Sequence, residues 1–473
     1  MQNNVFKITV LFLIVFFVNQ FQSLSQKHPN VILFVFDDAS RIDFGCYGNK
    51  NVKTPGTDAL AKEGTSYNKA FCTTSSCSPS RSVILSGLHN HRNGMYGLNH
   101  DYHNFQSHKD FKSLPVILDS LGYATARMGK FHVGPEEVYK FRYILPEPPG
   151  TRVKDQSTPQ KYIWQHDVVQ WANICKPFID TVSSPFFLYF CVHHPHHPFE
   201  TIGADSVPID KVTKPGYSPN LRHYQKEYAD FLRAIQNGDK AIVQLIHILK
   251  KSGKWDNTVF MVTSDNGAPF PNAKTNLYEP GINLPFVIRD PLVKAKNIKT
   301  DAMISFTDIA PTILDYAGYR DNGKRFHGKS FKSTVGKTVY QGFDEVYGSH
   351  TFHEITNYYP MRMIRTEKYK LIWNIASALP YPSGAGNGRE DNPELYDYVH
   401  NLSNPYGKKT VKDYVYRPVF ELYDIQQDPD EIVNLAFDKK YTSVLEELKL
   451  KIRIFQKQTN DPWIIKWREF DYH

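Results

Sequence analysis

The stretch Asn30-Val-Ile-Leu-Phe-Val-Phe-Asp-Asp38 decides how the rest of the chain can fold. Six of its first seven residues are apolar, and most of these are β-branched or aromatic. Such a run predicts a strand buried on both faces, as in a parallel sheet covered by helices. Two adjacent carboxylates, Asp37 and Asp38, follow at the carboxyl end, where ligands bind in open α/β folds. A helix N-cap explains one aspartate but not a pair, so the stretch favours a bound metal ion.

Two later stretches repeat the pattern of a buried strand that ends in polar residues. Pro185–Val192 is followed by a histidine-rich run, and Asn257–Thr263 is followed by Ser264-Asp265-Asn266-Gly267. The polar ends of the first and third stretches offer hard oxygen ligands, with neither thiolate nor imidazole among them. Such a set suits Ca²⁺ first and Mg²⁺ second. The predicted ligands are Asp37, Asp38, Asp265 and Asn266.

The stretch Cys77-Ser-Pro-Ser-Arg81 places a cysteine among hydroxyl residues. A free cysteine is usually a small buried hydrophobe, and these five residues alone leave that interpretation open. Ser82–Leu88 is expected to continue as a helix. The Cys77 loop would then lie at a helix N-terminus, where backbone N–H groups and the helix dipole favour anions.

Two histidine-containing segments come next in importance. Lys130 and His132 follow a predicted strand, Ala124–Met128, and project to the same side if the backbone stays extended.

The run His193-His-Pro-His-His-Pro198 could be a zinc site. Its adjacent, proline-stiffened histidines should diverge, however, and three of them are expected at the surface. The polar loop His89–Asp101 would suit a carbohydrate-lined or sulfate-lined pocket.

Length and composition indicate a globular protein with more than one core. The 473 residues are 41% hydrophobic and 22% charged, which excludes a disordered chain. One large domain and a smaller one are expected at this length. The net charge of +8 suits an anionic substrate, and no long basic run indicates a nucleic-acid partner.

The N-terminal residues predict export. Lys7 precedes an apolar run, Ile8–Val18, and Ser23-Leu-Ser25 supplies small residues at the spacing of a cleavage site. We therefore predict a signal peptide over residues 1–25 and a periplasmic or secreted protein without a stable membrane anchor. Five cysteines in an exported chain leave at least one unpaired or modified.

Taken together, these motifs resemble the type I, formylglycine-dependent sulfatase family. The resemblance extends over roughly Asn30 to Trp463. Five sequence motifs of the family occur here in the same order as in the family: Asp37-Asp38, Cys77-x-Pro79-x-Arg81, Gly129-Lys-x-His132, Pro195-His196-x-Pro198 and Asp265-Asn-Gly267.

The resemblance implies an alkaline-phosphatase-like α/β fold with a large, mostly parallel sheet flanked by helices. A smaller C-terminal antiparallel sheet with a helix completes it. The hairpin-like alternation of Pro360–Trp373 and the helical spacing of Val444–Phe455 agree with that second part. We expect the catalytic domain over residues 26–335 and the smaller α+β domain over residues 336–473.

The resemblance also implies roles for individual residues. Ca²⁺ would bind the four oxygen-bearing residues, and Cys77, converted to formylglycine by a formylglycine-generating enzyme, would complete its shell and act as nucleophile. Arg81 would hold the hydrated aldehyde, while Lys130 and Lys274 would contact sulfate. His196 is the expected acid and His132 the expected base, although these two roles could be exchanged.

Within the family, the chain is similar to the heparan N-sulfatase (sulfamidase) branch. Asn93–Leu98, Asp265–Pro271 and Asp461-Pro-Trp463 carry the similarity. Lys274, which replaces an arginine of that branch, and His193-His194, which replaces His-Asp, depart from it. Candidate substrate contacts are His353, Glu354 and Arg362, with a structural role in the hairpin as the alternative.

This similarity implies a sulfated carbohydrate substrate, with N-sulfoglucosamine of heparan or heparin first. An O-sulfate ester of an algal polysaccharide such as ulvan is the alternative. More distant alternatives are a phosphate or phosphonate ester hydrolase on the same fold and an inactive glycan-binding relative.

Overall fold

The computed structural model describes residues 28–154, 162–219, 221, 224–321, 323, 325–382 and 397–469. The predicted signal peptide over residues 1–25 lies outside these ranges. Among the helices that the structure describes, none combines the length and the apolar character needed to cross a bilayer.

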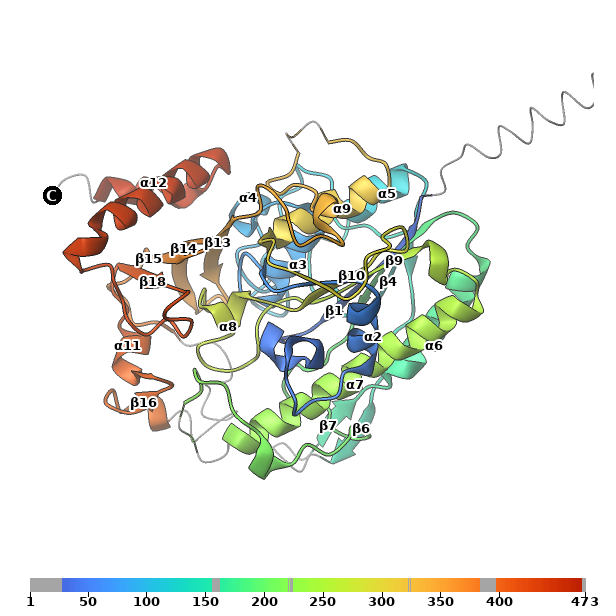
Figure 1. The fold of residues 1–473 in the computed structure, drawn as a ribbon, viewed down its shortest axis with the longest axis horizontal. Helices are drawn as coiled ribbons and strands as arrows, with labels where there is room; N and C mark the ends of the chain where they lie inside the picture. The colour runs from blue at the N-terminus through green and yellow to red at the C-terminus, as the bar shows by residue number, and fades with distance from the viewer. Residues whose placement is uncertain are drawn as a thin grey trace, which may run out of the picture.

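An eight-stranded sheet forms the centre of the molecule (Figure 1). Its strand order is β11-β2-β10-β9-β1-β8-β4-β5. The strands from β9 to β5 run parallel, whereas β10 pairs antiparallel with both β9 and β2. The predicted large, mostly parallel sheet is therefore confirmed. The strands are β1 (Asn30–Phe36), β2 (Thr65–Tyr67), β4 (Ala124–Gly129), β5 (Tyr143–Ile144), β8 (Phe186–Cys191), β9 (Thr258–Ser264), β10 (Phe286–Arg289) and β11 (Ile298–Thr300).

The three apolar stretches that predicted buried strands form the middle of this sheet. Every residue of β1, β8 and β9 is buried. Parallel strands need cover on both faces, and the helices provide it (Figure 1). One layer contains α2 (Pro55–Glu63), α6 (Val168–Thr181) and α7 (Tyr224–Lys251), and the other contains α3 (Cys77–Ser86), α5 (Leu114–Ser120) and α9 (Ile309–Tyr316).

A smaller antiparallel sheet follows in the chain, in the order β13-β14-β15-β18. The C-terminal helix α12 (Thr442–Gln458) packs on it, with Leu448 and Ile452 against Trp373. The predicted second sheet with a helix is therefore confirmed. The strands are β13 (Glu345–Phe352), β14 (Tyr358–Thr366), β15 (Tyr369–Asn374) and β18 (Phe420–Asp424). The expected domain boundary at residues 335–336 falls between the 3₁₀ turn Lys332–Thr334 and β13, and it stays a prediction.

Short elements complete the described chain. Two-residue and four-residue strands pair outside the main sheets: β3 (Ala70–Phe71) with β12 (Ile304–Ser305), β6 (Thr151–Lys154) with β7 (Tyr162–Gln165), and β16 (Pro405–Tyr406) with β17 (Lys409–Thr410). The remaining short helices are α4 (Asn90–Asn93), α8 (Glu279–Ile282) and α11 (Val411–Val415).

Candidate active site

The topology of the large sheet brings the predicted site residues to one edge. β1 lies between β8 and β9, and β4 lies beyond β8, with all four strands parallel. Phe36 pairs with Ser264, so Asp37 and Asp265 leave the sheet side by side. Lys130 leaves from the end of β4 in the same way. This edge is where ligands bind in open α/β folds.

Three of the predicted ligands form one buried cluster. Asp37, Asp38 and Cys77 each offer a ligand atom, and these atoms lie within 4.8 Å of one another. Cys77 Sγ is 3.8 Å from Asp37 Oδ1 and 3.7 Å from Asp38 Oδ1. Cys77 is the first residue of α3 and is 1% exposed, so the predicted placement at a helix N-terminus is confirmed.

Asp265 and Asn266 reach this cluster from β9. Asp265 Oδ1 accepts the backbone N–H groups of Asp38 and Asn266, at 3.1 and 2.8 Å. Asn266 Nδ2 donates to Asp38 Oδ1 at 2.7 Å. Asp38 has a φ of 71°, in the left-handed region that a non-glycine residue adopts only at a cost, and these contacts hold it there.

Three buried cations surround the carboxylates. Arg81 Nε donates to Asp265 Oδ2 at 2.8 Å, Lys130 Nζ to Asp37 Oδ2 at 2.5 Å, and Lys274 Nζ to Asp38 Oδ2 at 2.7 Å. Arg81 Nη2 also lies 3.6 Å from Asp37 Oδ1, so each carboxylate has at least one cationic partner, and three positive charges face three negative ones. Buried ions are tolerated only when they are paired in this way.

The pKa values of the carboxylates in the cluster depend on the cations around them. Burial raises the pKa of Asp37, but the neighbouring cations, Lys130 first, outweigh it and hold that pKa well below its usual range. Burial raises the pKa of Asp265 to about 7, although Arg81 opposes the rise. A cation held among these carboxylates would stabilise all of them in the charged form.

The oxygen atoms available as ligands indicate which ion would fit. Within the described structure, Asn266 Oδ1 is buried and has no hydrogen-bond partner, so this oxygen is available as a ligand. Carboxylate and amide oxygens are the ligands that Ca²⁺ prefers. A divalent ion here would leave the site with a net positive charge, which suits an anionic substrate. The predicted oxygen ligands therefore fit a hard divalent cation.

The burial of Cys77 bears on its chemistry. Burial raises the pKa of its thiol to about 12, so the unmodified side chain is protonated at neutral pH. Because the thiolate is the nucleophilic form, an unmodified Cys77 would attack poorly from this position.

The two histidines predicted to move protons occupy different parts of the edge. His196 Nε2 lies 3.7 Å from Asp38 Oδ2, and its side chain is 41% exposed. His132 Nε2 lies 2.6 Å from His100 Nδ1. Burial and the charge of Lys130 lower the pKa of both histidines. His196 is thus placed at the open side of the carboxylate cluster, and His132 beside a second histidine.

The backbone from Lys130 to His132 is not extended, so the condition under which both side chains would project to the same side is not met. β4 ends at Gly129, and His132 has a φ of 56°, which turns the chain. Lys130 therefore points at Asp37, while His132 points at His100. Nothing in the residues around His132 indicates this turn. His100 belongs to the polar loop His89–Asp101, and the sequence does not indicate that it contacts His132.

That polar loop is divided between the site and the protein interior. His100 reaches His132, whereas His89 and His91 are buried and pack against Phe455 of α12. One end of the loop therefore reaches the candidate active site, whereas His91, Arg92 and Tyr96 line a different pocket.

Of the three predicted substrate contacts, two lie near Cys77 and one lies in the protein interior. His353 Nδ1 lies 2.9 Å from Ser76 Oγ, so the connection between β13 and β14 reaches the residue before Cys77. Glu354 follows in that connection with a 40% exposed side chain. Arg362, by contrast, is 0% exposed and donates to both oxygens of Asp461. Its geometry does not support the predicted substrate contact, because its guanidinium is turned away from solvent into an internal ion pair.

The histidine side chains of the run His193–Pro198 point to different partners, as the prolines between them predict. His193 Nε2 lies 2.9 Å from Glu147 Oε1, His194 Nε2 lies 3.3 Å from Glu200 Oε2, and His196 faces Asp38. The expectation that His194 lies at the surface is wrong, since it is 1% exposed. The sequence offered no sign of its partner, Glu200.

Known protein families match the chain along most of its length. The sulfatase family model matches residues 29–319, and the model described as N-sulphoglucosamine sulphohydrolase, C-terminal, matches residues 272–379. Human N-sulphoglucosamine sulphohydrolase is 31% identical over an alignment of 476 positions, gaps included, which covers 93% of this chain and 92% of the relative. An ulvan-active sulfatase of Formosa agariphila is 32% identical over 441 residues, which cover 90% of this chain and 79% of the relative.

A solved structure shares the fold. A protein solved in complex with its substrate D-glucosamine-2-N,6-O-disulfate superposes with a TM-score of 0.65 at 20% identity. The superposition covers 92% of this chain and 99% of that protein. The two-sheet architecture described above is therefore that of the alkaline-phosphatase-like sulfatases.

Proposed function

This chain belongs to the sulfatase family and is a sulfuric ester or sulfamate hydrolase; we propose that its substrate is a sulfated sugar of the glycosaminoglycan type, with N-sulfoglucosamine first. The observation that carries the proposal is the buried cluster of Asp37, Asp38 and Cys77, ringed by three cations.

The charges of this cluster match what sulfate hydrolysis requires. A sulfate group is anionic and repels nucleophiles, so a site must screen its charge before the sulfur can be attacked. Lys130 pairs with Asp37 and Lys274 with Asp38, so two fixed ammonium groups flank the position proposed for the sulfate. Fixed positive charges that face the developing charge stabilise the transition state without reorganisation.

We propose that Cys77 is converted to formylglycine and that Ca²⁺ binds Asp37, Asp38, Asp265 and Asn266 beside it. The hydrated aldehyde would supply the nucleophilic oxygen, and the ion would polarise the sulfate oxygens. The sulfatase family match supports the conversion, and the oxygen donor set, including Asn266 Oδ1, which is unpartnered among the described residues, supports the ion. Conversion would make a formylglycine-generating enzyme a partner of the chain during maturation.

Protein side chains would then hold and move the protons. Arg81 is anchored by Asp265 and by the backbone carbonyl of Lys130, at 2.8 and 2.9 Å, and it would orient the nucleophile. His196, at the open side, is placed to protonate a leaving group that departs toward solvent. His132 would act as the base.

The sugar would contact the connection between β13 and β14. His353 is fixed by Ser76 next to Cys77, and Glu354 is exposed beside it. We retain both as substrate contacts and leave Arg362 out. The similarity to human N-sulphoglucosamine sulphohydrolase supports N-sulfoglucosamine, and the comparable similarity to an ulvan-active sulfatase supports an ulvan O-sulfate ester as the second candidate.

Export is part of the same proposal. The charged residue and apolar run over residues 1–25 support a signal peptide, which would deliver the enzyme to the periplasm or outside the cell. Sulfated polysaccharides would be met in either place.

A direct assay tests the proposed function. The full-length chain, produced with a formylglycine-generating enzyme, is incubated with N-sulfated heparin oligosaccharides and separately with ulvan oligosaccharides. We expect release of sulfate from the N-sulfated substrate, no release by Cys77→Ala, and the aldehyde at position 77 by mass spectrometry. Release from ulvan alone would replace the leading substrate. Release from neither substrate, with the aldehyde present, would contradict the proposal.

A further inference from the structure

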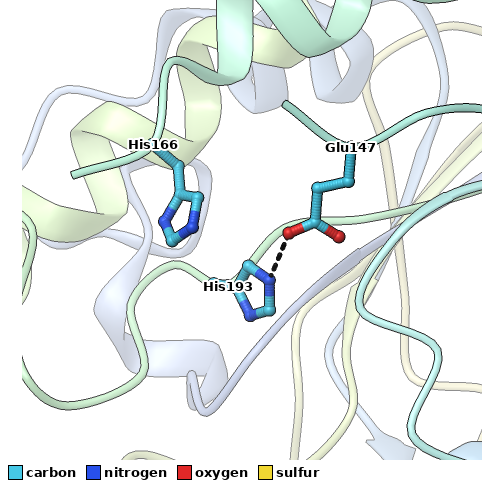
Figure 2. A group of neighbouring side chains, drawn as sticks. All are labelled: Glu147, His166 and His193. Carbon is cyan, nitrogen blue, oxygen red and sulfur yellow. Dashed lines mark hydrogen bonds and ion pairs between the residues drawn. The ribbon is translucent and has the colours of Figure 1, made fainter. Parts of the chain in front are cut away.

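A second group of metal-binding side chains lies apart from the carboxylate cluster. Figure 2 shows Glu147, His166 and His193 directed toward one another from three separate segments. Glu147 follows β5, His166 lies between β7 and α6, and His193 follows β8. Each offers one ligand atom, and these atoms lie within 4.8 Å of one another. None of the three belongs to the site described above.

One of the two histidines, His166, is prepared for a metal by its other contacts. His166 Nδ1 lies 2.7 Å from Glu200 Oε1, and the His166 backbone N–H donates to the other oxygen of the same carboxylate. His194 Nε2 lies 3.3 Å from Glu200 Oε2 without a hydrogen bond between them, and the Glu200 side chain is buried. A histidine whose one nitrogen is held by a carboxylate presents the other nitrogen as a ligand, which is the usual arrangement around protein-bound zinc.

We propose that Glu147, His166 and His193 bind a divalent transition metal of the Zn²⁺ type. Two imidazoles and one carboxylate suit Zn²⁺, whereas Ca²⁺ prefers oxygen ligands alone. Zn²⁺ bonds of about 2.0–2.2 Å hold tetrahedral ligand atoms about 3.3–3.5 Å apart. Glu147 Oε1 and His193 Nε2, now 2.9 Å apart, would therefore exchange their hydrogen bond for bonds to the metal and separate slightly, and both side chains have room to move. Their side chains are 35% and 33% exposed.

The exposed side of the group leaves a coordination position open to water or to an oxygen of a bound sugar. Three protein ligands and one open position are typical of zinc sites that bind a fourth, exchangeable group. The site would therefore have room for a fourth, exchangeable ligand.

The metal also braces the loop that carries His196. The backbone N–H of His196 donates to the carbonyl of His193 at 2.9 Å, and Asp37 N–H donates to the carbonyl of His194 at 2.9 Å. A bond from the metal to His193 therefore joins this loop to the segments that carry Glu147 and His166. The alternative is a metal-free hydrogen bond between Glu147 and His193, which would take up no metal.

Metal titration of the full-length protein tests the site. The protein is stripped with a chelator, resupplied with Ca²⁺ to fill sites with oxygen ligands, and titrated with Zn²⁺ by calorimetry and with Co²⁺ by visible spectroscopy. The titration is done at about pH 8, above the ordinary pKa of histidine. We expect one Zn²⁺ per chain and the absorption bands of four-coordinate Co²⁺.

Variants assign the uptake to these residues. His166→Ala and His193→Ala should abolish the Co²⁺ bands, and Glu200→Gln should weaken Zn²⁺ binding by about 10–100-fold through loss of the contact to His166. His247→Ala, which removes an exposed histidine of α7, is the matched control and should bind as the unaltered chain does. Glu147→Gln changes an exposed residue, so it tests the site even if a histidine variant misfolds.

The outcomes are separable from those of the sulfatase assay, because metal binding is measured without substrate. Absence of Zn²⁺ uptake by the unaltered chain would overturn the proposal. So would uptake that survives in His166→Ala, His193→Ala and Glu147→Gln, since the metal would then lie elsewhere.

Discussion

Lys274 Nζ donates to Asp38 Oδ2 at 2.7 Å, and both side chains are buried at the edge of the large sheet. Because Asp38 also lies 3.7 Å from Cys77 Sγ, the ammonium group is held one residue away from the proposed nucleophile. A lysine here supplies a point charge, whereas an arginine would supply a planar group with several donors. The charge at this position, more than its shape, should therefore matter for the reaction.

Replacing Lys274 tests that inference. Lys274→Met should lower kcat by about 10²–10³-fold, as expected when one preformed electrostatic contact to the transition state is lost. Lys274→Arg should retain most of the activity, because the charge remains. Steady-state kinetics on an N-sulfated oligosaccharide measure both. Equal activity of Lys274→Met and the unaltered enzyme would show that Lys274 does not contact the reacting sulfate.

Calcium removal should destabilise the protein without unfolding it. An ion that binds only the folded chain adds about 2.7 kcal/mol to the free energy of unfolding at a concentration 100 times its Kd. We therefore expect a lower Tm in a Ca²⁺ chelator and recovery when Ca²⁺ alone is restored. Asp38→Asn should remove the calcium-dependent part of the Tm. A Tm that does not respond to Ca²⁺ in the unaltered chain would count against a calcium site at the carboxylate cluster.

The ion pair of Arg362 with Asp461 predicts an effect on stability. Both side chains are fully buried, and the guanidinium donates to both carboxylate oxygens. Arg362→Met leaves the Asp461 charge unpaired and should cost about 3–5 kcal/mol in the free energy of unfolding. The double variant Arg362→Met/Asp461→Asn should recover part of this loss. Urea unfolding measures the change, and kinetics on the folded fraction provide the control. A raised KM at unchanged stability would instead indicate a substrate contact.

The same pair predicts a pH dependence. Burial raises the pKa of Asp461, but Arg362 outweighs it and holds that pKa well below its usual range. Because the folded pKa is lower than the unfolded value of about 3.9, the stabilisation is fully present above that value and is lost as the pH falls below it.

The unfolding free energies of the unaltered chain and of Asp461→Asn should accordingly differ by a constant amount near neutral pH. The difference should shrink as the pH falls through about 4 toward the lower folded pKa. Urea unfolding at a series of pH values checks this. A difference that stays the same at acid pH would show that the carboxylate contributes through its shape and not through its charge.

The central sheet and its carboxyl edge could be predicted from the sequence because the signal is local. β1, β8 and β9 are apolar at every position of their cores, and Asp37, Asp38, Asp265 and Asn266 each follow a strand directly. Parallel strands place such residues together whatever the length of chain between them.

Contacts between segments of irregular structure could not be predicted in this way. The partner of Arg362 lies 99 positions later in the chain, and no periodicity relates the two. Glu147, His166 and His193 each occur in a different connection, so their convergence depends on how those connections fold. The turn at His132 likewise depends on a single φ angle that its residue type does not demand.

The burial of Cys77 limits when an enzyme can reach its sulfur. Only 1% of its surface is accessible once β1, β9 and α3 have come together around it. Any catalyst that acts on the sulfur must therefore reach the polypeptide while it is still unfolded, during or soon after synthesis. If Cys77 is converted as proposed, a copy that folds with its thiol intact would keep it, and the share of active molecules would depend on how fast the modification proceeds relative to folding.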